Sequence, residues 1–194
     1  MGASAIGADY FDLEAILAEE ERVPVLFLTS VTGVGRALDP SCDDDDLAEG
    51  VKVDLPQWLT KGQLSEKRFV EVRTPKCFNE RVKKDIQADP GVVNLRERSA
   101  FFYAFGRSLC RILDNNAELA DFLLITFRGR YKDLLLQSHF APDEDVQALK
   151  RIMTREEIRI FEAGRQSMQS FTQWRQRKDS IYNMAPILGK KRKR

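Results

Sequence analysis

Few residue types able to do chemistry occur in this chain, and they are scattered along it. The 194 residues include one histidine, His139, so neither a catalytic triad with a choice of base nor a multi-histidine metal site can be assembled. A helix-capping or surface position explains His139 better than catalysis. The three cysteines, Cys42, Cys77 and Cys110, lie more than 30 residues apart, which favours reduced intracellular thiols over disulfides or a zinc site.

Two other patterns resemble ligand-binding loops only superficially. Gly33-Val34-Gly35 follows a strand-like run, but the third glycine position of a dinucleotide loop is Leu38, and no amphipathic helix follows. The four aspartates at 43–46 lack the spacing, the glycine and the terminal glutamate of a calcium loop, so a solvated acidic loop is favoured. We therefore predict no catalytic, metal or cofactor site and no small-molecule ligand, and hence a protein that is not an enzyme.

Composition is typical of a folded protein with one or two domains. Hydrophobic residues make up 43% of the chain and charged residues 31%. No run of 18 apolar residues occurs, which excludes a membrane-spanning helix. The first six residues lack the basic and apolar regions of a signal peptide, so secretion is not expected.

Charge is distributed unevenly along the chain. Residues 1–50 hold twelve Asp and Glu against Arg22 and Arg36, whereas residues 51–194 hold 29 Lys and Arg against 18 Asp and Glu. Five consecutive basic residues end the sequence: Lys190, Lys191, Arg192, Lys193 and Arg194. Their density predicts a nuclear import signal, with a non-specific nucleic-acid-binding arm as the alternative.

The first part of the chain, residues 1–74, predicts a small β-containing domain. A short helix with Leu13, Ile16 and Leu17 on one face precedes strand-like runs at 25–32, 51–55 and 69–72, with a helix beginning at Pro56. The stretch 39–49 is predicted to be an acidic loop that buries nothing. Three residues are assigned to the core of this domain or to an interface: Leu55, Trp58 and Leu59.

Residues 75–180 read with helical period and predict a domain of about four helices. We expect these at 76–88, 95–113, 117–140 and from 142 to about 178, followed by a flexible basic tail at 181–194. The predicted fold class is mainly α with a small β-rich domain, that is, α+β.

The third and fourth of these helices carry more apolar surface than a small bundle can cover. The third is apolar around much of its circumference, and the fourth would span roughly 50 Å at the usual helical rise. We therefore predict burial against other subunits, through Phe122, Phe127, Tyr131, Leu134, Phe161, Phe171 and Trp174. The basic residues Arg128, Arg130 and Lys132 are assigned to a solvated or inter-subunit face rather than to a nucleic-acid site.

Several short strings together resemble one family, the GINS replication complex, and within it the third Psf subunit. They occur in the family's order and span most of the chain: LEAIL at 13–17 with VPV at 23–25, VDLPQWLTKG at 53–62, ADPGVVNL at 88–95, FYAFG at 102–106, TFRGR at 126–130 and FEAGR at 161–165 leading to Phe171 and Trp174. A small strand-containing domain ahead of the helical one also resembles the second and third Psf subunits. The acidic loop and the basic tail depart from the family pattern.

The resemblance implies a non-catalytic assembly subunit. A helical A domain would join three sister GINS subunits, with a small B domain ahead of it. In that family the complex joins the MCM ring and a RecJ-like cofactor to form the eukaryotic replicative helicase, and it helps hold polymerases at the fork. A nuclear location is then expected. The alternative is a free-standing nuclear adaptor that binds DNA through its tail and helices, whose signature is steeply salt-dependent DNA binding.

Overall fold

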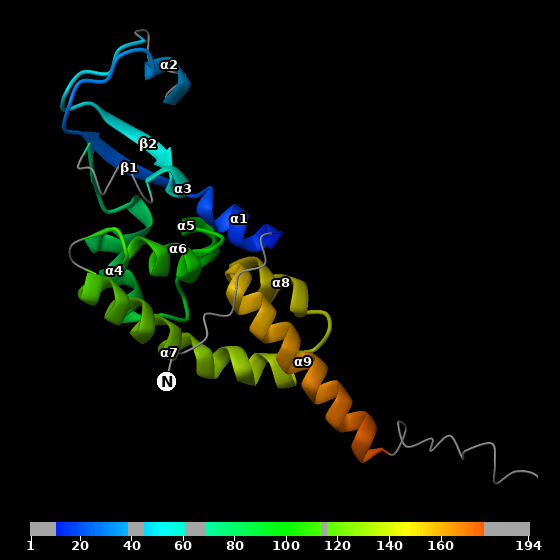
Figure 1. The fold of residues 1–194 in the computed structure, drawn as a ribbon. Helices are drawn as coiled ribbons and strands as arrows, with labels where there is room; N and C mark the ends of the chain where they lie inside the picture. Colours follow the sequence, from blue (N-terminus) through cyan, green and yellow to red (C-terminus); the bar gives the residue numbers. More distant parts are fainter. Residues whose placement is uncertain (1–10, 39–44, 61–68, 114–115, 177–194) are drawn as a thin grey trace, which may run out of the picture.

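A computed structural model describes residues 11–38, 45–60, 69–113 and 116–176 (Figure 1). Its elements follow in order: α1 (Leu13–Glu19), β1 (Arg22–Phe27), α2 (Gly35–Leu38), β2 (Lys52–Pro56), α3 (Gln57–Leu59), β3 (Val70–Val72), the 3-10 helix η2 (Lys76–Phe78), α4 (Glu80–Ala88), α5 (Leu95–Arg98), α6 (Phe102–Leu109), α7 (Asn116–Phe140), α8 (Val146–Ile152) and α9 (Arg155–Arg175). The fold class is α+β, as predicted: a small sheet lies at one end, and a bundle of helices makes up the rest.

The sheet has three antiparallel strands in the order β2-β1-β3. Val25 in the central strand lies opposite Val53 in β2 and Val72 in β3, and alternate side chains along β1 are buried. The strand predicted at 25–32 lies nearer the N-terminus, because β1 begins at Arg22, before Pro24, and ends at Phe27.

One prediction for the acidic loop is wrong. Leu47 is buried in the core of the sheet domain and forms an isolated bridge with Val31. Leu47 therefore anchors the second half of the loop. The acidic run just before it made the whole stretch look solvent-exposed in the sequence. Residues 39–44 lie outside the described residues.

The main core is built by aromatic side chains between η2, α4, α6 and the first half of α7. Phe78 contacts Phe102 and Phe105 with ring centroids 4.8 and 5.7 Å apart. Val23 of β1 belongs to the same cluster, and the buried Gln57 side chain donates to the Phe105 carbonyl at 3.3 Å. The sheet therefore packs directly on the helices.

Three of the four predicted helices are interrupted. The helix expected at 76–88 is the 3-10 helix η2 followed, after the extended Asn79, by α4. The helix expected at 95–113 is interrupted at Ser99, whose extended backbone lets its hydroxyl accept from the Phe101 amide and donate to Glu21. The helix expected from 142 to about 178 is interrupted at Met153. Thr154 then starts α9 with a capping box, in which its hydroxyl accepts from the Glu157 amide and the Glu157 carboxylate accepts from the Thr154 amide.

The helix predicted at 117–140 is confirmed as α7. Figure 1 shows α9 crossing α7 near its C-terminal end and continuing beyond it. Among the described residues, no helix is long and apolar enough to span a membrane.

Candidate subunit interface

The crossing of α7 and α9 fixes which faces of both helices stay exposed. Every fourth residue of α7 points inward: Phe122, Thr126, Arg130, Leu134 and Ser138 are all buried. Where the two helices meet, Gly164 of α9 lies against Ser138, and a Cβ at Gly164 would come within 2.4 Å of the Ser138 hydroxyl. The helices therefore approach closely at this point.

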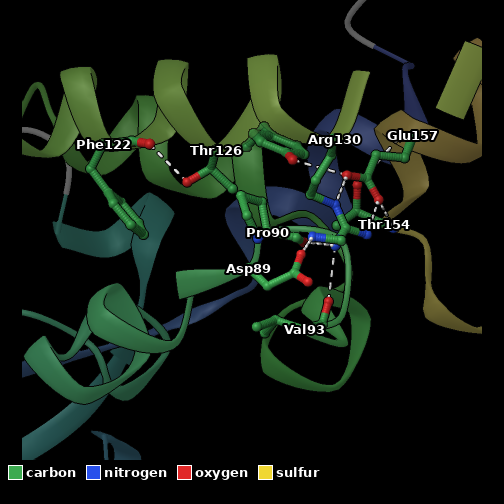
Figure 2. Close-up of polar contacts among 10 residues, drawn as sticks. Asp89, Pro90, Val93, Phe122, Thr126, Arg130, Thr154 and Glu157 are labelled. Carbon is green, nitrogen blue, oxygen red and sulfur yellow. Dashed lines mark hydrogen bonds and ion pairs between the residues drawn. The ribbon is translucent and has the colours of Figure 1, made fainter. Parts of the chain in front are cut away.

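A buried ion pair between Arg130 and Glu157 joins these helices (Figure 2). Arg130 donates from Nε to Glu157 Oε1 at 2.6 Å and from Nη2 to Oε2 at 3.0 Å, in a bidentate arrangement. Its Nη1 donates to the carbonyls of Pro90 at 2.5 Å and Val93 at 2.9 Å. One guanidinium thus connects α7, α9 and the loop after α4.

The neighbours of this pair complete its hydrogen bonding. Tyr103 donates to Glu157 Oε1 at 2.9 Å, and the Thr154 amide donates to Oε2 at 3.1 Å. Burial, with the Glu157 charge as the next cause, raises the pKa of Tyr103, so its hydroxyl stays a donor. Burial opposes the charge on Arg130, but the hydrogen bonds and charge of Glu157 outweigh it and raise the pKa of Arg130.

The assignment of Arg130 to a solvated or inter-subunit face is therefore wrong. The guanidinium is buried and saturated with acceptors inside the chain, while Arg128 and Lys132 are exposed. The sequence held a signal for this burial, because Arg130 falls on the four-residue repeat between Phe122 and Leu134. The network is structural, and in the described part of the chain no group of three or more His, Cys, Asp or Glu side chains could hold a metal.

The interface prediction needs correction for three of its residues. Phe122, Leu134 and Phe161 are at most 6% exposed, because the chain's own core covers them. Phe122 belongs to the main core, and the other two form a smaller cluster with Met153. Helical periodicity identified these side chains as buried but not what buries them.

The other four predicted interface residues retain accessible surface. Phe127 is half-buried between the rings of Tyr103 and Tyr131, and Tyr131 is exposed. Near the end of α9, Phe171 is 50% and Trp174 69% exposed, with ring centroids 5.8 Å apart. Their role at an interface stays a prediction.

Further apolar surface is exposed at residues that the predicted interface set did not include. On α7, the exposed apolar residues other than Tyr131 are Leu124, Ile125, Leu136 and Phe140. Helix α1 buries only Ala18 and leaves Leu13, Ile16 and Leu17 exposed, while Glu14 pairs with Arg159 of α9 at 3.0 Å on the surface. An ordinary surface helix buries its large apolar residues, which α1 does not do. On α7, the apolar pattern around much of the helix was the available signal.

The three residues predicted for the core or an interface of the sheet domain also divide into buried and exposed ones. Leu55 is fully buried and Leu59 packs on the sheet core, whereas Trp58 is exposed. Lys190 to Arg194 lie outside the described residues.

Comparison with known proteins shows the family of this chain. Residues 11–63 match the PSF3 N-terminal domain, and residues 77–176 match the GINS complex protein helical bundle domain. The chain belongs to the PSF3 family of GINS proteins. Similar proteins named DNA replication complex GINS protein PSF3 come from Xenopus laevis, at 30% identity over 96% of this chain and 89% of the relative, and from Homo sapiens, at 32% over 89% and 83%.

The two matched regions of the PSF3 family correspond to the two structural parts of the chain. The first covers α1 to α3 with strands β1 and β2, and the second covers all helices from α4 onward. The Arg130–Glu157 pair and both exposed ends, on α7 and α9, lie within the helical bundle domain.

Proposed function

We propose that this chain is a non-catalytic subunit of the four-subunit GINS complex, which acts in chromosomal DNA replication. The observation that carries the proposal is exposed apolar surface within the GINS helical bundle domain: Phe171 and Trp174 on α9, and Leu124, Ile125 and Phe140 on α7. Single exposed apolar residues are ordinary, but aromatic residues clustered on helices mark protein contacts. Three sister subunits would cover these faces.

At a finer level, we propose that the assembled complex joins the MCM ring and a RecJ-like cofactor in the replicative helicase. The chain would act in initiation and elongation, and contact with a replicative polymerase would be indirect. Its contribution is binding energy that favours one arrangement of the ring, while ATP hydrolysis belongs to the ring.

Co-expression tests the assembly proposal. The chain is produced with and without the three sister subunits, and native mass spectrometry determines the composition of what purifies. We expect one copy of each of the four subunits, and aggregation of the chain produced alone. A well-behaved monomer that ignores the sisters, and whose DNA binding falls steeply with salt, would favour the adaptor alternative.

We also propose that Lys190 to Arg194 direct nuclear import. Because partners can carry a subunit into the nucleus, the test uses a fluorescent fusion that also carries Phe171→Ser and Trp174→Ser to prevent assembly. Replacing the five basic residues by Gln should then move the fusion to the cytoplasm. Nuclear retention of the Gln variant would contradict the import role.

A further inference from the structure

The sheet and the helices each have a core of their own. Five strand residues and Leu47 of the loop before β2 form the sheet core, and none of them belongs to the main core of the helices. Of the described strand residues, Val23 alone belongs to the main core, and Val72 packs partly against both cores. The apolar connection between the two cores is therefore small.

Gln57 of α3 makes a central polar contact at this junction, at the end of the sheet nearest the helices (Figure 1). Its backbone is fixed, because its amide donates to the Glu21 carbonyl at 2.9 Å and its carbonyl accepts from the Thr60 hydroxyl at 2.8 Å. Its side chain is fully buried, and Nε2 donates to the Phe105 carbonyl of α6 at 3.3 Å. This distance is slightly longer than that of a usual N–H···O hydrogen bond.

Two buried polar atoms at this junction have no hydrogen-bond partner in the described part of the chain. They are Gln57 Oε1 and the Ser108 hydroxyl oxygen. Ser108 lies one helical turn after Phe105, and hence on the side of α6 that Gln57 contacts. Exchanging the two ends of the Gln57 amide would not help, because Oε1 would then face the Phe105 carbonyl. Both atoms bind water when the junction is open, so burying them without partners opposes docking of the sheet.

Two further polar contacts connect the first part of the chain to the helices. The Ser99 hydroxyl donates to the Glu21 carboxylate at 2.9 Å, and Glu14 pairs with Arg159 at 3.0 Å on the surface. Polar contacts of this kind exchange for contacts with water at little net cost, and surface ion pairs stabilise weakly. The junction is therefore held less firmly than either core.

We propose that this junction opens reversibly while both cores stay folded, so that the sheet domain leaves its position on α6 and returns to it. Gln57 sets the balance, because its incompletely bonded amide weakens docking relative to an apolar side chain of similar size. A partner that binds only the open arrangement would shift the equilibrium toward it. The inference concerns this chain alone and goes beyond the proposed function, which it does not require.

Cys77 provides a probe of the opening. It lies in η2, between the last strand and α4, and is 8% exposed. Burial, with the Glu21 charge as the next cause, raises the pKa of Cys77 to about 12, so the closed protein should resist alkylation. Opening removes both causes and restores an ordinary thiol. With Cys42→Ser and Cys110→Ser in the full-length chain, the rate of iodoacetamide labelling at Cys77 reports the opening.

A second cysteine position measures unfolding of the helical core. Ile86→Cys, combined with Cys77→Ser in the same background, places the thiol at a fully buried position of α4. Both labelling rates are divided by those of the urea-unfolded chains. We expect Cys77 to be labelled at least about tenfold faster than a cysteine at position 86, because opening of the junction precedes unfolding of the core. Equal rates would overturn the proposal.

Gln57→Met tests the role of the buried amide. Methionine has a similar length and volume but no polar group that needs a partner, so labelling of Cys77 should slow about tenfold. Gln87→Met, at an exposed position of α4, is the matched control and should leave the rate unchanged. Ser108→Ala removes the second unpartnered oxygen with little change in shape and should slow labelling severalfold; it decides the matter if Gln57→Met does not fold. Labelling as fast as in the parent chain, or faster, in the folded variants would overturn the proposal.

Discussion

The two halves of α7 differ in what covers them. Its first half packs Leu119, Phe122 and Leu123 into a large aromatic core shared with η2, α4 and α6. Its second half contributes only Leu134 to a small buried cluster with Met153 and Phe161. Tyr131, Leu136 and Phe140 of this second half are exposed. The first half is anchored in the chain's own core, although Leu124 and Ile125 on its outer side are exposed. The second half has little core of its own and presents surface suited to other subunits.

Substituting one phenylalanine in the large core and one in the exposed region should give the largest difference in the free energy of unfolding. Phe105→Ala removes a fully buried ring from the large core and should lower the free energy of unfolding by about 3–5 kcal/mol. Phe140→Ala removes a ring of the same size from the surface and should change it by less than about 0.5 kcal/mol. Urea denaturation measures both, and similar losses would contradict the division.

The boundary between the halves is held by Arg130. Arg130→Met leaves the Glu157 carboxylate buried without its ion-pair partner and should cost about 3 kcal/mol of unfolding free energy. Arg128→Met, on the exposed side of the same helix, is the control and should cost less than about 0.5 kcal/mol. If both variants unfold at the same urea concentration, the network does not hold the helix crossing.

The close approach of α7 and α9 predicts a smaller effect. Gly164→Ala brings a methyl group against Ser138 and should cost about 1–3 kcal/mol. Adding Ser138→Gly removes the clashing atoms and should restore part of the loss, which thermal unfolding of the single and double variants would detect. Additive losses would show that the two positions do not contact each other.

The smallest change in stability is expected at the end of α9. Phe171→Ser with Trp174→Ser should alter the unfolding free energy by less than about 0.5 kcal/mol, since both rings are exposed. The same double variant should nevertheless fail to co-purify with sister subunits. Gln169→Ser with Gln173→Ser, at exposed positions of the same helix, provides the control. Intact assembly of the aromatic variant would remove these residues from the interface.

Much of the fold was accessible from the sequence because local patterns determine it. The strand at 52–56 follows from alternating apolar residues, and the helix at 117–140 follows from helical period. The capping box from Thr154 to Glu157 was also present in the sequence, but the apolar stripe continues across it, so one long helix was predicted. Arg130 was misjudged because a charged residue is normally exposed, and its acceptors on Glu157, Pro90 and Val93 come from distant segments.

The same limit applies to the candidate interface. Period alone cannot tell Phe161, which Leu134 and Met153 cover, from Phe171, which the described chain leaves exposed. Both are apolar residues of one helix, Phe171 on its apolar stripe and Phe161 beside that stripe. Only the place where α9 passes beyond α7 separates them, and that place is set by the Gly164 contact and the Arg130 pair.

Amide hydrogen exchange, compared between the free chain and the co-expressed complex, most directly tests whether the second region is a subunit interface. Assembly should slow exchange in peptides covering 131–152 and 166–176, because covering those helices suppresses their local opening. Peptides from α6, inside the large core, should be unchanged. Slower exchange confined to the large core, or no change in the two predicted stretches, would contradict the interface.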